Sequence, residues 1–273
     1  MSKMMDAVLS CMGVLVLLIC DIRCMRRRSE LGRSVVVLLS VGALSVAGYT
    51  IIFLSSTYKW MSAGNCIFFA GMDWLCYAMF LYTIEYTKYK GKPLFDLKPW
   101  MKTVTVIILT IDSVSMLCNI AWEHAMKFQV VYYRNERYLR FIPQPIFYLH
   151  LMLCYIPFAV SLCIFLYKVY TAPHIYKRKF GFVILTLAGV MIVNAVFLIT
   201  KPPVDISIYT YAAAAVLLDY FTFYYVPRQL EQIMQRLGQN KQNDLLIMFD
   251  EEDNCIYMNR NMSLFLKGCK VDR

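Results

Sequence analysis

SVVVLLSVGALSVAGYTIIFLS, residues 34–55, is a run of 22 residues without a charged side chain. A hydrocarbon core ~30 Å thick needs about 20 apolar helical residues, because every backbone N–H and C=O must be satisfied within the segment. This run therefore predicts a membrane-spanning helix. Six further runs qualify, and the chain is predicted to cross the membrane seven times. The predicted spans are 4–20, 34–55, 65–86, 103–120, 146–169, 180–200 and 206–225.

The composition of the chain excludes a soluble enzyme. Of its 273 residues, 59% are hydrophobic and 17% are charged, and the mean hydropathy is +0.52. A soluble domain is about 45–50% apolar and about 25% charged, so this chain has too few water-facing side chains. The formal charge of +10 comes from short basic groups between apolar runs, which is typical of membrane topology and not of nucleic-acid binding. The ten cysteines include no CxxC pair, so no disulfide framework, metal site or cofactor is predicted.

The distribution of Lys and Arg predicts the orientation. Fourteen of them lie in or beside the loops after the first, third and fifth spans, against seven on the opposite side. Loops rich in Lys and Arg stay in the cytoplasm, so the N-terminus is expected outside and the C-terminus inside. In the external loop 121–144, aromatic residues alternate with charged ones. This loop is interpreted either as a lid over a pocket or as an interfacial connector.

The character of the sequence changes after residue 225, where a cytoplasmic linker is predicted over residues 226–243. Pro227 ends the seventh span, and the apolar residues that follow have the i, i+3, i+4, i+7 spacing of one helical face. This pattern predicts a short amphipathic helix. One heptad is too short to establish a coiled coil, so dimerisation through the helix is a hypothesis. The apolar residues are Leu230, Ile233, Met234 and Leu237.

The tail, residues 244–273, has the pattern of a mixed α and β fold. Two short apolar runs flank the acidic segment 251–254, which predicts a β-hairpin, and residues 261–267 read as the start of a helix. A lone hairpin is marginal in water, and fewer than about 40 residues seldom fold alone. The tail is therefore expected to be the front of a domain that continues beyond it.

Two kinds of residue stand out inside the predicted spans. A charged side chain at the centre of a span costs at least ~2.5–3.5 kcal/mol, so each needs a reason. If the helices pack with their polar groups inward, these groups converge on an outer-leaflet cavity that offers a small ligand polar partners. The alternative is that they are packing residues with hydrogen bonds between helices. The polar groups are Asp73, Asp112, His150, Asn194 and Asp219. The small residues expected to allow close helix approach are Gly42, Gly48, Gly71, Gly181, Gly189 and Ala212 to Ala215.

Several motifs are missing from the sequence. No Lys lies within 206–225, so a retinal Schiff base in the seventh span has no attachment point. GxSxG, HExxH, GxxxxGK[ST] and GxGxxG do not occur, and no two glycines are adjacent, which excludes a GGDEF motif. The three histidines all lie in or next to membrane segments, so no cytoplasmic helix carries a phospho-acceptor histidine. Catalysis is therefore not expected from this chain itself.

The order of local motifs along the seven spans resembles a known family. Residues 81–87, LYTIEYT, are similar to the family's exit from the third span, and Tyr224-Tyr225-Val226-Pro227 to its exit from the seventh. Residues 119–124, His150, Tyr155 and Asn194 are further similarities. Together they resemble the N-terminal seven-helix membrane region of bacterial sensor histidine kinases, which also precedes diguanylate cyclase domains. The tail, with Asn259 after its second strand, is similar to the start of a PAS domain.

This resemblance implies an all-α polytopic protein of the bacterial inner membrane: a seven-helix sensor domain over 1–225, the linker, and an incomplete PAS-like α+β tail. It adds Tyr155 to the expected ligand-binding residues. A small molecule or a state of the membrane is the expected stimulus, and a histidine kinase or diguanylate cyclase, in the full-length or a partner protein, is the expected output. The resemblance also implies that the seventh span passes the signal on through the linker helix, by Pro227, Leu230, Ile233, Met234 and Leu237. The alternative function is a small seven-span transporter that uses intramembrane carboxylates. A third alternative is a truncated product without signalling of its own.

Overall fold

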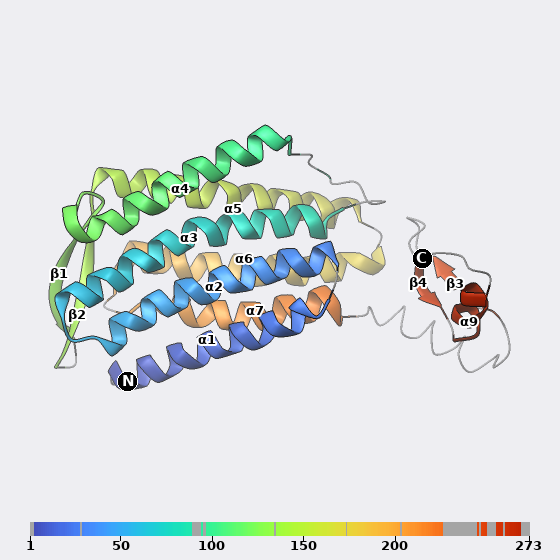
Figure 1. Cartoon of the computed structure of the whole chain (residues 1–273), viewed down its shortest axis with the longest axis horizontal. Coiled ribbons are helices and arrows are strands. Elements are labelled where there is room, and N and C mark those ends of the chain that lie inside the picture. The colour runs from blue at the N-terminus through green and yellow to red at the C-terminus, as the bar shows by residue number, and fades with distance from the viewer. Residues whose placement is uncertain are drawn as a thin grey trace.

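The computed structural model contains a bundle of seven helices with a β-hairpin across one end (Figure 1). It describes residues 3–27, 29–88, 94, 97–133, 135–172, 174–202, 204–225, 245, 247–249, 255–258 and 260–268. Six of the helices are long and apolar enough to cross a membrane, and the seventh has 17 residues. The chain is a mostly helical polytopic membrane protein. The helices of the bundle are α1 (Lys3–Met25), α2 (Glu30–Leu54), α3 (Tyr58–Tyr86), α4 (Pro99–Trp122), α5 (Pro145–Thr171), α6 (His174–Thr200) and α7 (Ser207–Phe223).

The seven predicted spans correspond to these helices in order, although most helices are longer than predicted. The largest difference is at α3, which begins at Tyr58 and not at residue 65. Lys59 and Trp60 lower the local hydropathy and stopped the predicted span early. Both are exposed, at the end of the bundle that carries the β-hairpin, where a helix can continue beyond its apolar segment.

The arrangement of the helices leaves α4 outside a ring. Helices α1, α2, α3, α5, α6 and α7 each pack against the next, and α7 closes the ring on α1. Helix α4 packs on the outside of α3. As a result α3 has neighbours on three sides, and more of its apolar segment is buried than in the other candidate spans. Polar groups on α3 are therefore placed to meet groups from several helices.

Small residues set the spacing of α2 and α3. A Cβ at Gly64 would lie 2.7 Å from the carbonyl oxygen of Gly48, and one at Gly71 would collide with Ser45. A Cβ at Gly48 would lie 2.6 Å from the Ile67 side chain. The predicted role of Gly48 and Gly71 in close packing is confirmed. Gly42 makes only ordinary contacts, and nothing lies within 4 Å of a Cβ at Gly181 or Gly189, so for those three the prediction was wrong.

The loop between α4 and α5, predicted to be external, is a β-hairpin, which corrects the all-α prediction. Strands β1 (Met126–Tyr133) and β2 (Glu136–Pro143) pair antiparallel from Met126 with Pro143 to Tyr133 with Glu136. Asn135 lies in the turn with φ of 63°, a conformation that Asn tolerates better than most residues. The alternation of aromatic and charged residues, interpreted as a lid or a connector, is the two-residue period of a strand.

The hairpin is fastened to the end of the bundle by both apolar and polar contacts. The ring of Phe141 lies 5.5 Å from Phe69 of α3 and 5.8 Å from Phe197 of α6, measured between centroids. Lys3 Nζ donates to the carbonyl oxygens of Ser55 and Arg137 at 2.6 and 3.1 Å. These contacts connect β2 with α1, α3 and α6, so the hairpin covers this end of the ring.

The described part of the tail has the predicted elements. Strands β3 (Ile247–Phe249) and β4 (Cys255–Met258) form an antiparallel pair with an irregularity after Met248. Helix α9 (Arg260–Gly268) follows. The predicted hairpin and helix are confirmed as secondary structure. The linker, residues 226–243, lies outside the described residues, and so do the predicted signal-transmitting residues Pro227, Leu230, Ile233, Met234 and Leu237.

The glycine contacts generate a prediction for stability in detergent. Gly64→Ala should lower the free energy of unfolding by about 1–3 kcal/mol, because the added methyl group meets backbone of α2 that cannot move aside. The matched control is Gly189→Ala in α6, where the methyl group has free space and alanine favours the helix by up to ~1 kcal/mol. Thermal unfolding of both purified variants measures the difference. An unfolding temperature for Gly64→Ala equal to that of the control would contradict close α2–α3 packing.

Candidate functional site

Three helices bring ionisable side chains together inside the bundle. Asp73 of α3, Asp112 of α4 and His150 of α5 are 1%, 6% and 0% exposed. Nδ1 of His150 lies 2.7 Å from Oδ2 of Asp112 and 3.3 Å from Oδ1 of Asp73. The imidazole is thus held between two carboxylates from different helices. The structure confirms that these three predicted residues lie together.

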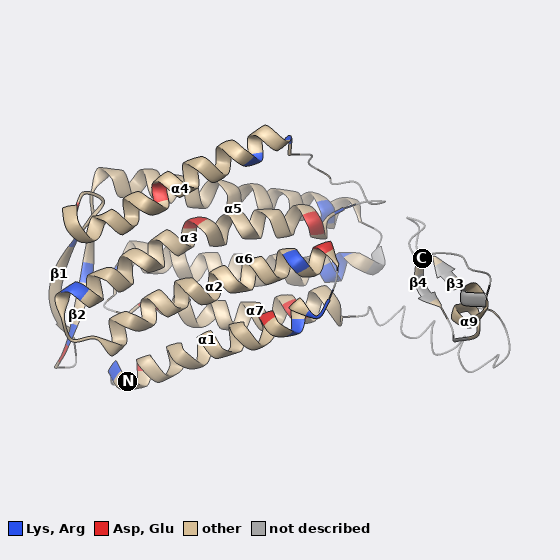
Figure 2. Cartoon of the chain, viewed as in Figure 1, with Lys and Arg blue, Asp and Glu red and all other residues tan. Residues whose placement is uncertain are grey.

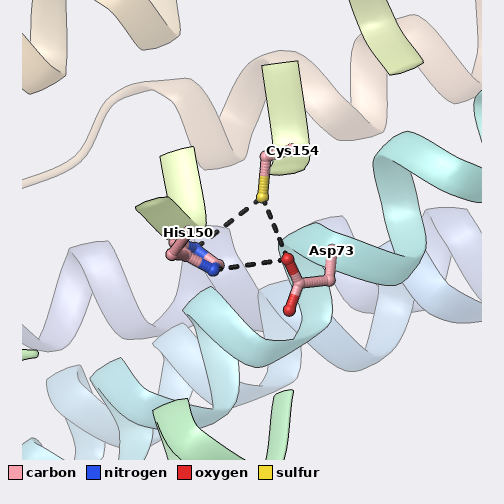
Figure 3. Close-up of side chains that lie close together, drawn as sticks. All are labelled: Asp73, His150 and Cys154. Atoms are coloured by element: carbon pink, nitrogen blue, oxygen red, sulfur yellow. Dashed lines mark hydrogen bonds and ion pairs between the residues drawn. The ribbon is translucent and has the colours of Figure 1, made fainter. Parts of the chain in front are cut away.

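Two further polar groups complete this cluster. Cys154 lies one helical turn after His150 on α5, and its Sγ donates to Oδ1 of Asp73 at 3.3 Å and lies 3.7 Å from Nε2 of His150 (Figure 3). Ser113 Oγ donates to the other oxygen of Asp73 at 3.0 Å. We call Asp73, Asp112, Ser113, His150 and Cys154 the acid–histidine cluster. Its groups can share a proton or bind a cation.

A cavity lies beside this cluster, within the helix ring. Its volume is about 90 Å³, and most of its lining is apolar. Every helix of the ring contributes, whereas α4 contributes none of the lining residues found among the described part of the chain. One lining residue from each helix, in chain order, is Leu17, Leu39, Met79, Phe158, Leu187 and Leu218.

Polar groups from α5, α6 and α7 meet in the lining of this cavity. The Tyr155 hydroxyl donates to Oδ1 of Asn194, and Nδ2 of Asn194 donates to the Tyr211 hydroxyl at 3.1 Å and to Ser207 Oγ at 3.3 Å. Tyr155, Asn194 and Tyr211 all line the cavity. An apolar cavity with a few convergent polar groups is the usual form of a small-molecule site. Tyr155 and Asn194 thus line a cavity of this form, and their binding of a ligand stays a prediction.

Asp219 lies apart from both groups and corrects the prediction of one shared cavity. It is buried in α7, where its Oδ2 lies 3.5 Å from Nη2 of Arg23 and its Oδ1 accepts from Cys24 Sγ at 3.5 Å. Both partners belong to the last turns of α1, far along the bundle from the hairpin. The six predicted residues therefore occupy three places. Helical rotation decides which neighbours a buried side chain meets, and hydropathy does not report it.

A scan against protein-family models matches residues 7–226 to the N-terminal 7TM region of histidine kinase. That match covers all seven helices except the first residues of α1. The chain belongs to this family. It is therefore a multi-pass membrane protein of a histidine kinase sensor family, which confirms the coarser part of the resemblance in its sequence. No curated protein sequence matches the chain.

The family similarities at the exits of α3 and α7 are neighbours in space. The Tyr82 hydroxyl of the LYTIEYT segment is hydrogen-bonded to Thr222 Oγ1 of α7 at 2.8 Å. At the end of α7, the Tyr224 hydroxyl accepts from Nη2 of Arg23 at 2.8 Å, and Arg27 of α1 lies over the Phe223 ring at 4.2 Å. The last turn of α7 is thus fixed to α1 and α3 in this member of the histidine kinase 7TM family.

Sequence reasoning missed residues whose role depends on distant partners. Cys154 and Tyr211 looked like ordinary span residues, although Cys154 follows His150 at the i, i+4 spacing that places two side chains on one face. Asp205 was missed because it lies in the short connection before α7. Its Oδ1 accepts from the backbone N–H of Ser207 at 2.8 Å, and its own N–H donates to the Tyr49 hydroxyl at 2.9 Å. Asp205 thereby fixes the start of α7 to α2.

Burial makes Asp205 a pH-dependent part of the fold. Desolvation raises the pKa of its carboxyl group to about 6, although hydrogen bonds from Ser207 act in the opposite direction. Because the folded-state pKa lies above the ordinary value of 3.8, protonation favours the folded state. This contribution is complete below the ordinary pKa and is lost as the pH rises through about 6.

Asp205→Asn should therefore flatten the pH dependence of stability. Between pH 5 and pH 7.5 the Asp205 contribution to the free energy of unfolding falls on the order of 1 kcal/mol in the parent chain, and the amide keeps the acceptor for Ser207 without titrating. Unfolding temperatures of both proteins across this pH range provide the measurement. Parallel pH profiles for the two would show that the Asp205 carboxyl titrates alike in the folded and unfolded chain.

Proposed function

We propose that this chain is the sensory input module of a bacterial signal-transduction protein of the inner membrane, with its N-terminus outside and its C-terminus in the cytoplasm. The Lys and Arg counts support this orientation, since basic loops stay cytoplasmic. Figure 2 shows Lys and Arg residues gathered where α1 ends and α2 begins. That end is opposite the hairpin, which then faces outward.

The observation that carries the proposal is that α7 both lines the central cavity and leads to the tail. Tyr211, Ala214, Ala215 and Leu218 of α7 are lining residues. A small molecule in the cavity touches α7 and the other five helices of the ring at once. A ligand shifts the balance between two helix arrangements only by its difference in affinity for them. A movement of α7 changes the shape of the cavity, so a ligand there binds the two helix arrangements with different affinities.

The contacts at the end of α7 suggest how the movement is held in check. Arg23 binds both Asp219 and Tyr224, and its neighbour Arg27 lies over the rings of Phe223 and Tyr224. These contacts hold α7 against α1 near its exit. In the proposed path, a shift of α7 exchanges these contacts and passes through the linker helix to the tail.

The output lies outside the seven-helix region in this proposal. The β3–β4 hairpin and α9 are the elements expected at the start of a PAS domain, and we assign residues 244–273 to that start. The chain itself is not an enzyme in this assignment. The output is a histidine kinase or diguanylate cyclase in the full-length or a partner protein. Dimerisation through the linker brings two such outputs together.

Filling the cavity should bias the output. We expect Ala214→Leu, in a chain joined at its C-terminal end to a reporter histidine kinase core, to change autophosphorylation about fivefold, since a coupling of ~1 kcal/mol has that effect. Val216→Leu is the matched control, because Val216 is 47% exposed on the outer face of the same helix. Equal kinase activity in both variants and the parent would refute the role of the cavity.

The transmission path has its own test in the same reporter. Two residues inserted beside Gly238 would rotate the following part of a helix by ~200°, whereas seven residues restore its phase within ~20°. We expect the two-residue insertion to change kinase activity severalfold and the seven-residue insertion to leave it near the parent level. If the two insertions act alike, the signal does not travel through a continuous linker helix.

A further inference from the structure

We propose that Asp73, His150 and Cys154 bind a single zinc-like transition-metal ion inside the bundle. One ligand atom from each residue lies within 4.8 Å of the other two, and all three residues are buried. Figure 3 shows the carboxylate, imidazole and thiol pointing toward one another from α3 and α5. This inference does not depend on the sensory role, because a structural ion would hold α3 and α5 together whether or not the chain senses a stimulus.

The two spacings from the Cys154 thiol agree with tetrahedral coordination. Zinc lies about 2.3 Å from sulfur and about 2.0–2.2 Å from nitrogen or oxygen, so neighbouring ligand atoms are about 3.6 Å apart in a tetrahedron. Sγ of Cys154 lies 3.7 Å from Nε2 of His150 and 3.3 Å from Oδ1 of Asp73. Oδ1 of Asp73 lies 3.3 Å from Nδ1 of His150, so coordination through Nε2 requires a rotation of the imidazole or of the Asp73 carboxylate. A water molecule is the natural fourth ligand in a site with three protein donors.

Neighbouring groups orient two of the three ligands from outside the site. Asp112 lies 2.7 Å from Nδ1 of His150, which places the Nδ1 proton toward the carboxylate and leaves Nε2 free to face the thiol. Ser113 donates to the oxygen of Asp73 that does not face Cys154. A histidine ligand that donates its second ring N–H to a carboxylate is the common outer arrangement of zinc sites.

The charge of the cluster also favours a cation. Within the described residues, the ion pairs of Asp73 and Asp112 are formed with His150 alone. A histidine that binds a metal is neutral, and with a neutral His150 two ionised carboxylates would leave negative charge buried in an apolar bundle, which is costly. A divalent ion that binds the Cys154 thiolate, and releases the thiol proton to solvent, lowers that net negative charge by one.

The donor set indicates which class of ion is bound. Hard ions such as Mg²⁺ prefer oxygen ligands, whereas thiolate and imidazole suit zinc and similar metals. Only one carboxylate is in the donor set, together with one thiolate and one imidazole. The site should therefore discriminate strongly between Zn²⁺ and Mg²⁺. The competing explanation is a protonated His150 held as a structural ion pair between the two carboxylates.

The test measures Zn²⁺ bound to the purified full chain after removal of metal by a chelator. We expect one equivalent of Zn²⁺ in the parent chain and a rise in unfolding temperature on adding Zn²⁺ but not Mg²⁺. Cys154→Ser should lose both effects. The matched control is Cys163→Ser, an exposed thiol on the same helix that should keep both. Zn²⁺ binding by Cys154→Ser equal to that of the parent would overturn the proposal.

Two further measurements keep the test decisive if a variant folds poorly. Co²⁺ bound to the unmodified chain should give a thiolate-to-cobalt charge-transfer band and a tetrahedral absorption spectrum. Asp112→Asn should keep the stoichiometry but weaken Zn²⁺ binding about 10–100-fold, as expected for a group that orients a ligand. A Co²⁺ spectrum without the thiolate band, or no Co²⁺ binding at all, would support the structural ion pair and reject the metal site.

Discussion

An ionisable group inside an apolar bundle must find its partners within the protein, and Asp73 places this constraint on three helices. Asp73 is 1% exposed, at the middle of the helix with the most neighbours. Its two oxygens are met by Ser113 of α4 and by His150 and Cys154 of α5. A displacement of either helix leaves a buried carboxylate without partners, which costs several kcal/mol. Through Ser113 and Asp112, α4 is joined to both α3 and α5.

The acid–histidine cluster and the cavity are separate, but consecutive residues serve both. On α5, Cys154 faces the cluster and Tyr155 lines the cavity. On α3, Asp73 belongs to the cluster, whereas Met72 lines the cavity and accepts a hydrogen bond from Tyr211 through its sulfur. Any rotation of α3 or α5 therefore alters both places together. A change in the protonation of the cluster therefore alters the lining of the cavity directly, and a ligand in the cavity alters the cluster in the same way.

Several features of the fold follow from the sequence alone, for stated physical reasons. Hydropathy located the seven helices because the bilayer sets their length, and the resemblance to the histidine kinase region agrees with the family match over residues 7–226. Hydropathy did not show which helices pack against one another. Helices that are apolar on every side carry little information about which face turns inward. Asp73 and His150 were found as costly polar residues, yet their contact is made across 77 residues of chain. Cys154 and Gly64 were missed because burial and close packing are visible only in three dimensions.

The length of α7 has a mechanical consequence. At 17 residues it is about 25 Å long, shorter than the ~30 Å hydrocarbon core, whereas α3 with 29 residues extends beyond it. The bilayer must therefore become thinner around α7, whereas the longer helices beside it match the bilayer by tilting. Among the described helices of the bundle, α7 is the one shorter than this core, so each ångström of added thickness raises its mismatch energy. The thickness of the bilayer thus acts on the helix that leads to the tail, even with nothing bound in the cavity.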